Sequence, residues 1–213
     1  MGTEILRKGL TLKLEDERYF SLRQRGVLFL DDEVDEGSFA KFCRDIVYLG
    51  LGGSVFGELN SKTGPIWVVL NSPGGEVLYG LAIYDCIRMF VEKGIEVNVL
   101  GVGVVASMAT VILQAGAKRF ALPHTQFLVH QVSETILFKT EEVSESKERV
   151  EELDRINKIA MGIIAKRAGL DLDELLKLSK KKDCWFDPEG ARNLGNFGLI
   201  DKIVDTPPFL SVE

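Results

Sequence analysis

The sequence predicts an α/β fold with a largely parallel β-sheet. Short segments that are apolar throughout and rich in β-branched residues recur along the chain, as is typical of strands covered on both faces. Helical segments with one apolar face follow several of these strands, and this alternation favours parallel strands joined by helices. The length of 213 residues suits one domain with a full hydrophobic core.

The first strands and helices alternate as this fold requires. Val27–Leu30 predicts a short buried strand, and a helix is expected from about Ser38 to Tyr48. Gly50–Gly64 contains five glycines and is expected to form a loop. Ile66–Leu70 (IWVVL) predicts a second strand that is buried on both faces.

An amphipathic helix is expected after the turn Asn71–Gly75 (NSPGG). The apolar residues that we expect to form its buried stripe are spaced three, four and seven apart. They are Val77, Leu81, Tyr84 and Val91.

A second strand–turn–helix unit follows. Val97–Val105 predicts a buried strand, Ala106–Ser107 a turn and Met108–Ala115 a short apolar helix. Phe127–Val132 predicts a third strand of the same kind.

Residues 141–167 predict a long helix with a narrow apolar seam. Its acid–base pairs have the favourable i,i+4 order, and they are Glu145/Arg149, Glu151/Arg155 and Asp154/Lys158. The seam consists of Val143, Val150, Leu153, Ile156, Ala160 and Ile163. Such a stripe packs either on the helix's own domain or on another subunit. Gly169 is expected to end the helix.

Composition narrows the class of protein. The formal net charge of -6 disfavours nucleic acid as a partner, and no apolar run approaches the length of a membrane helix. The first residues carry no continuous apolar core typical of a secretory signal, so we expect a cytoplasmic protein. Cys43, Cys86 and Cys184 are odd in number and widely spaced, which argues against a disulfide framework or a metal site. No cofactor is expected.

Ser107 is the first candidate catalytic residue. It lies between a predicted strand and a helix that starts directly after it, where free N–H groups of the first helical turn could stabilise a developing oxyanion. An ordinary N-cap is the alternative role for a serine at this position. The pair Gly74–Gly75 lies in the equivalent turn of the preceding unit, as a second source of N–H donors or as a simple tight turn.

The candidate general base and its partner are less distinctive. His130 lies in the predicted strand FLVHQV, where a histidine is either structural or lines a cleft near the strand's end. His124 follows a proline and is expected in an exposed turn. Asp183, beside the apolar Cys184–Phe186, could be a partly buried carboxylate that orients an imidazole, or a surface acid that balances the neighbouring lysines.

Eight short motifs together resemble the proteolytic subunit family of the Clp protease (ClpP), in the family's order and from about Tyr19 to Val204. They are NSPGG (71–75), GLAIYD (80–85), ASMA (106–109), AGAK (115–118), ALP (121–123), VHQ (129–131), EGA (189–191) and GLID (198–201). The resemblance implies that Ser107 is the nucleophile, His130 the base and Asp183 the third member of a catalytic triad. It also implies that the backbone N–H groups of Gly75 and Met108 form the oxyanion hole.

The resemblance further implies a ClpP/crotonase-like fold of repeated strand–strand–helix units. A single peptidase domain over residues 1–213 would carry a projecting strand–helix handle at about 132–167. Family members form seven-membered rings, and two rings meet as a tetradecamer that encloses the sites. A Clp-type AAA+ ATPase unfolds polypeptide substrates for this chamber. The chain has no Gly-x₄-Gly-Lys-Ser/Thr loop, consistent with ATP being used by the partner.

Departures from the family pattern keep alternatives open. After His130-Gln131 the family continues with proline and a glycine-rich strand, whereas this chain has Val132–Lys139 (VSETILFK), so ring stacking is in question. Glu76 replaces a small or aliphatic residue and is expected to disfavour acidic peptides. The alternatives are a phage-type head-maturation protease of the same family, an inactive ring subunit that scaffolds an active one, and a crotonase-type hydratase or isomerase.

Overall fold

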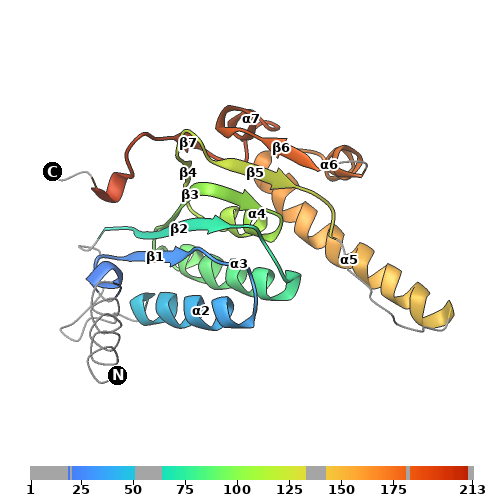
Figure 1. The fold of residues 1–213 in the computed structure, drawn as a ribbon, viewed down its shortest axis with the longest axis horizontal. Helices are drawn as coiled ribbons and strands as arrows, with labels where there is room; N and C mark the ends of the chain where they lie inside the picture. Colours follow the sequence, from blue (N-terminus) through green and yellow to red (C-terminus); the bar gives the residue numbers. More distant parts are fainter. Residues whose placement is uncertain (1–18, 20, 51–63, 133–142, 181–182, 211–213) are drawn as a thin grey trace, which may run out of the picture.

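The computed structural model describes residues 19, 21–50, 64–132, 143–180 and 183–210. Their strands form one seven-stranded sheet in the order β1-β2-β3-β4-β7, with β5 beside β3 and β6 beside β5 (Figure 1). Every pairing is parallel except the antiparallel pair β5–β6. The strands are β1 (Val27–Leu30), β2 (Ile66–Ser72), β3 (Val97–Ala106), β4 (Arg119–Ala121), β5 (Gln126–Val129), β6 (Cys184–Phe186) and β7 (Lys202–Ile203). The predicted α/β fold is confirmed.

The four expected helices are present, with ends that differ by a few residues from those expected. They are α2 (Glu36–Gly50), α3 (Val77–Glu92), α4 (Met108–Leu113) and α5 (Val143–Ala168). The helices α6 (Leu172–Ser179) and α7 (Pro188–Arg192) and the 3₁₀ turn η1 (Pro208–Leu210) were not predicted. None of them is both long and apolar enough to cross a membrane. The loop expected at Gly50–Gly64 falls mostly on residues 51–63, which lie outside the described residues.

On the edge away from β2, strand β3 pairs with two different strands along its length. Its first half, Val99–Gly101, pairs with β4, and its last residues, Val104–Ala106, pair with β5. Gly103, with φ of 65°, lies between the two halves, and the Asn71 side chain accepts a hydrogen bond from the Val104 N–H (3.0 Å). A left-handed φ of this kind suits glycine. This divergence brings β5 alongside the end of β3, where the turn into α4 begins.

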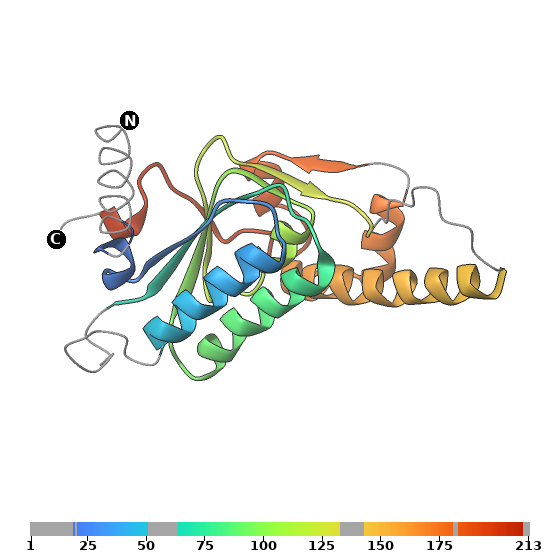
Figure 2. The ribbon, with the colours of Figure 1, turned by 60° about the horizontal axis from the view of Figure 1, so that its bottom comes forward.

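Helices α2 and α3 lie side by side against one face of the sheet (Figure 2). The predicted buried stripe of α3 was wrong in its residues, because Val77, Leu81, Tyr84 and Val91 are only half-buried. The fully buried stripe is offset from it and consists of Gly80, Ile83, Ile87 and Phe90. α3 touches α2 and α4 as well as the sheet, so its half-buried flanks are apolar too.

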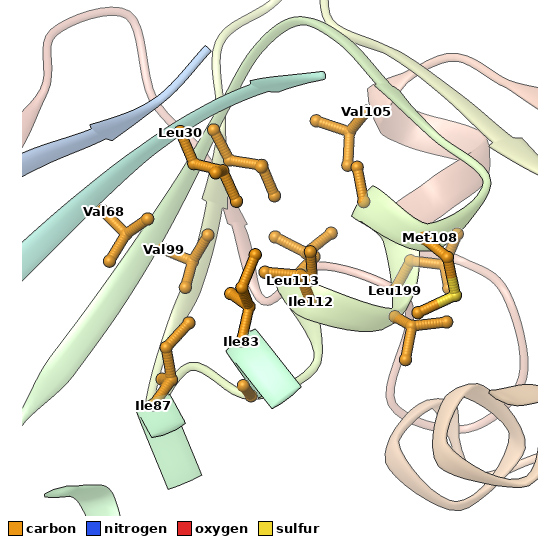
Figure 3. Close-up of a cluster of buried hydrophobic side chains, with 14 of the residues drawn as sticks. Leu30, Val68, Ile83, Ile87, Val99, Val105, Met108, Ile112, Leu113 and Leu199 are labelled. Atoms are coloured by element: carbon orange, nitrogen blue, oxygen red, sulfur yellow. The ribbon is translucent and has the colours of Figure 1, made fainter. Parts of the chain in front are cut away.

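The main core fills the space between these helices and the strands (Figure 3). Strand residues meet residues of α3 and α4 there, as in the close-up. The strand residues are Leu30, Val68, Val99 and Val105, and the helical ones are Ile83, Ile87, Met108, Ile112 and Leu113. On the opposite face, Trp67 packs on Phe120 and on Phe209 of η1, with ring centroids 5.2 and 5.5 Å apart.

Helix α5 runs from Val143 to Ala168, close to the predicted limits, and extends beyond the sheet (Figures 1 and 2). The predicted seam was only partly right: Ala160 is buried, but Val150 is 61% exposed. The second half of the helix buries a neighbouring stripe against its own domain, formed by Asn157, Ala160, Met161, Ile164, Ala165 and Ala168. Gly169, with φ of 69°, follows the last helical residue as expected.

The predicted ion pairs of α5 are partly confirmed. Lys158 pairs with Asp154 (2.6 Å), whereas Arg155 pairs with Glu152 rather than with Glu151. The side chain of Glu145 lies outside the described residues.

Candidate active site

Ser107 lies in a strained turn between β3 and α4. Its φ of 55° and ψ of −123° make it the one non-glycine residue with positive φ in the described part of the chain. Such a conformation costs on the order of 1–3 kcal/mol and persists only where the surroundings impose it. Its side chain makes no capping hydrogen bond to α4, so the ordinary N-cap alternative is wrong.

Backbone hydrogen bonds hold this turn on both sides. The Ser107 N–H donates to the Leu128 carbonyl of β5 (2.9 Å). The Ser107 carbonyl accepts from the Thr110 N–H (3.0 Å) and from the Thr110 hydroxyl (2.6 Å), and Thr110 is buried. The N–H and the carbonyl of Ser107 are therefore both hydrogen-bonded, whereas its hydroxyl makes no capping hydrogen bond to α4.

Gly74 packs directly against the serine turn. A Cβ on Gly74 would lie 2.6 Å from the Ser107 Cβ and 2.6 Å from the Ala106 carbonyl oxygen, and φ at this glycine is 93°. Neither the space nor the backbone conformation accepts a side chain. Glycine at this position therefore allows the two strand–helix turns to approach each other.

Gly75 is held by a bridge to Val34. The Val34 N–H donates to the Gly74 carbonyl, and the Glu76 N–H donates to the Val34 carbonyl, both at 2.7 Å. In a parallel bridge of this pattern, the N–H of the central residue points to the opposite side. The N–H of Gly75 therefore faces away from Val34, and Gly75 lines the pocket that contains Ser107.

Met108 is the first residue of α4 and lines the same pocket. Its N–H has no partner within the helix, as for every first-turn residue. Its side chain is buried over Gly80, where a Cβ would lie 2.5 Å from the Met108 Cε. The two predicted oxyanion donors, Gly75 and Met108, thus meet at one pocket.

His130 lies at this pocket as well, but not inside a strand as predicted. β5 ends at Val129, and His130 is the next residue, half-buried. The alternative of a cleft residue near the strand's end is therefore the correct one. Within the described residues, neither the Ser107 hydroxyl nor the His130 ring makes a hydrogen bond. A hydrogen bond between the two side chains would therefore have to form when substrate binds. In unliganded enzymes the hydrogen bonds of catalytic pairs are often long or poorly aligned.

Asp183 directly precedes strand β6 and does not line the pocket. The antiparallel β5–β6 ladder pairs Val129 with Cys184, so Asp183 precedes β6 where His130 follows β5. Of the two alternatives for Asp183, partial burial is not observed: Asp183 is exposed, as a surface acid would be. His124 is exposed in a turn, as predicted.

The pocket has a volume of about 140 Å³, and its wall combines polar groups with apolar side chains. Val77, Val111 and Val132 contribute to it, together with three residues of α5, which are Ala160, Met161 and Ile164. The sequence analysis assigned none of the α5 residues to the site. Their spacing of one and three places them on one helix face, but only the packing of α5 shows that this face meets Ser107.

The described residues contain no group of three or more histidine, cysteine or acidic side chains that could hold a metal ion. The polar groups at the pocket are those of acyl transfer instead: a hydroxyl, an imidazole and two free backbone donors.

Comparisons with known proteins find similar sequences over most of the chain. A family model described as Clp protease matches residues 14–207. The chain is 28% identical over 204 residues to the ATP-dependent Clp protease proteolytic subunit 2 of Corynebacterium diphtheriae, covering 92% of this chain and 90% of that protein. It is 31% identical to proteolytic subunit 1 of Streptomyces avermitilis (91% and 82% covered) and 32% identical to proteolytic subunit 2 of Prochlorococcus marinus (89% and 87%).

Proposed function

The chain belongs to the Clp protease family, and we propose that it is a serine endopeptidase with Ser107 as nucleophile, His130 as general base and Asp183 as the residue that orients the imidazole. One observation carries the proposal. The strained Ser107 turn opens on the same pocket as His130, Gly75 and Met108, and the serine side chain has no capping role there.

In the proposed reaction, His130 takes the proton of the Ser107 hydroxyl as the oxygen attacks a peptide carbonyl. The N–H groups of Gly75 and Met108 stabilise the oxyanion of the tetrahedral intermediate. The protonated His130 then donates its proton to the leaving amine, and an acyl-enzyme on Ser107 remains. Water hydrolyses this ester by the reverse proton transfers.

Asp183 would accept a hydrogen bond from the far nitrogen of the His130 ring. The register of β5 and β6 supports this role, because His130 and Asp183 directly adjoin the Val129–Cys184 pair that ends the ladder. A carboxylate hydrogen-bonded to the imidazole holds it in the required tautomer and stabilises its charged form.

The substrate is proposed to be an unfolded polypeptide with an apolar side chain at the cleaved bond. The valine, methionine and isoleucine wall beside Ser107 supports this preference, since it offers no charged partner.

The assembly is proposed from the family. The relatives are named proteolytic subunits of an ATP-dependent protease. We therefore propose heptameric rings, stacked through a handle formed by about residues 132–167, and a Clp-type AAA+ ATPase that delivers substrate to the chamber. A phage-type head-maturation role and an inactive scaffolding subunit are the alternatives. Because the matched family is a protease family, the comparisons do not support a crotonase-type hydratase.

A fluorophosphonate probe tests the proposed nucleophile. The wild type should be labelled at Ser107, whereas Ser107→Ala should not be labelled and should lose on the order of 10⁶ in peptide turnover. Ser179→Ala, a buried serine on α6, is the matched control and should label normally. An unlabelled wild type, assembled as rings by native mass spectrometry, would point to the scaffolding role. Labelling that survives Ser107→Ala would defeat the assignment.

A further inference from the structure

Asn157 is a buried polar side chain on an otherwise apolar face of α5. It is 8% exposed, and Ala160, Met161 and Ile164 follow it three, four and seven positions later on the same face. These three residues line the pocket beside Ser107. Burying an amide costs free energy unless it is hydrogen-bonded, so this position calls for a specific partner.

That partner is the backbone just beyond His130. The Val132 N–H donates to the Asn157 Oδ1 at 3.0 Å. Val132 lies three residues past the end of β5 and takes part in none of the strand pairings of the described residues, and its own side chain forms part of the pocket wall. The hydrogen bond therefore ties the segment that carries His130 to the helix that forms the opposite wall.

The serine side of the site is held independently of this bond. Ser107 is fixed by Leu128 and Thr110, and Gly75 is fixed by Val34. The β5 ladder ends at Val129, one residue before His130. β5 thus holds the backbone before His130. In the described part of the chain, the hydrogen bond to Asn157 holds the backbone after it.

We propose that Asn157 is a positioning residue of the peptidase, which sets the placement of His130 and of the pocket wall through its hydrogen bond to the Val132 N–H. The inference rests on the function proposed above. It requires an acceptor oxygen at position 157, which an amide or a carboxylate supplies and an aliphatic side chain does not.

The test compares the rate of fluorophosphonate labelling, the kcat and KM for a fluorogenic peptide, and the unfolding midpoint. Asn157→Leu keeps the approximate volume but removes the acceptor, and should lower the labelling rate and kcat roughly a hundredfold, as for an approximately 1 Å misplacement of a catalytic group. Asn157→Asp keeps an acceptor and should recover most of the rate.

Asn98→Leu is the matched control. Asn98 is a buried asparagine of β3 that donates to Glu96 and does not line the pocket. It should lose stability to a similar extent as Asn157→Leu while labelling at nearly the wild-type rate. All variants are compared in the same assembly state, checked by native mass spectrometry.

The outcomes separate this inference from the proposed function. A wild type that is not labelled at all overturns both. If the wild type is labelled and Asn157→Leu is labelled at the same rate, the positioning role alone is overturned. The same holds if Asn98→Leu, at equal stability, loses as much of the labelling rate as Asn157→Leu. Should Asn157→Leu not fold, Asn157→Ala replaces it, because alanine favours the helix. Its labelling must fall for the inference to stand.

Discussion

His130 directly follows, and Asp183 directly precedes, the Val129–Cys184 pair that ends the antiparallel β5–β6 ladder. The two candidate catalytic residues are 53 positions apart in the sequence, and a ladder of three residue pairs places both of them next to its last pair. The first prediction follows from this relationship.

Asp183→Asn should lower kcat by on the order of 10³–10⁴, because an amide does not hold the imidazole in the required tautomer or stabilise its charge. The measurement is peptide hydrolysis at saturating substrate. Asp173→Asn, an exposed acid on α6, is the control and should leave kcat unchanged. If Asp183→Asn hydrolyses peptides like the wild type, Asp183 is the surface acid of the alternative interpretation.

Gly74→Ala should disable the site. Its Cβ would lie 2.6 Å from both the Ser107 Cβ and the Ala106 oxygen, so the serine turn must shift, with an expected loss of at least about a hundredfold in labelling. Gly94→Ala is the matched control, because φ there is 84° and no atom lies within 4 Å of the added Cβ. Equal labelling in the two variants would mean that close approach of the glycine turn is unimportant.

Ala160→Met should narrow the pocket and change the preferred side chain at the cleaved bond. Ala160 is buried and lines the pocket, so a longer side chain occupies part of its roughly 140 Å³. Cleavage after leucine or methionine should fall more than cleavage after alanine, measured as kcat/KM on matched peptides. Lys166→Met, an exposed change on the same helix, should leave the ratio unaltered. An unaltered ratio in Ala160→Met would place the side chain of the substrate elsewhere.

Glu76 is expected to disfavour acidic peptides. It is exposed, it directly follows Gly75 of the pocket, and its side chain does not cap α3. Glu76→Gln should raise kcat/KM for acidic peptides relative to neutral ones, and more so at low ionic strength. If the wild type already cleaves acidic and neutral peptide libraries equally, Glu76 has no such role.

Asp201 should make stability depend on pH. Burial opposes ionisation of Asp201, but hydrogen bonds from the buried Arg119 outweigh it and hold the pKa of Asp201 below its ordinary value of 3.8. A lowered pKa stabilises the fold above the ordinary value, and this contribution is lost as the pH falls through the folded-state pKa.

Asp201→Asn should therefore cost about 2 kcal/mol near pH 7, an amount that allows for the partial exposure of the carboxylate. The difference from wild type in urea unfolding should shrink below about pH 4. Asp205→Asn, an exposed neighbour, should show little effect at either pH. A difference for Asp201→Asn that is constant with pH would contradict the ion-pair account.

Much of the fold could be predicted from the residues. The strands β1, β2 and β3 were found because their apolar, β-branched runs are buried on both faces, and that burial leaves a local signature in the sequence. The stripe of α3 was misassigned because Gly80 carries no apolar signal, although it faces the buried Met108. The end of β5 was misplaced because no turn-forming residue separates the apolar run Phe127–Val129 from the residues after it, although the strand ends at Val129.

The candidate site divides in the same way. Ser107, Gly75 and His130 could be found from the sequence because each lies in a short local motif, in which the backbone turn or strand end needs particular residue types. The neighbours of Asp183 in the sequence left burial and exposure open, because burial depends on segments distant in the chain, and its proposed role came from the resemblance. Asn157 gave no signal, since a single polar residue in an amphipathic helix is ordinary.

The amino-acid order alone thus determined the longer elements, namely strands β1, β2 and β3 and helices α2 to α5, and the sharp turns at Gly74–Gly75 and Gly169. Those features follow from side-chain periodicity and from glycine's tolerance of left-handed backbone. Only the tertiary structure decided which turns share a pocket, which face of α5 closes it, and that the Val132 N–H reaches Asn157. Such contacts join residues far apart in sequence, and they are selected by the packing of the whole core rather than by any local preference.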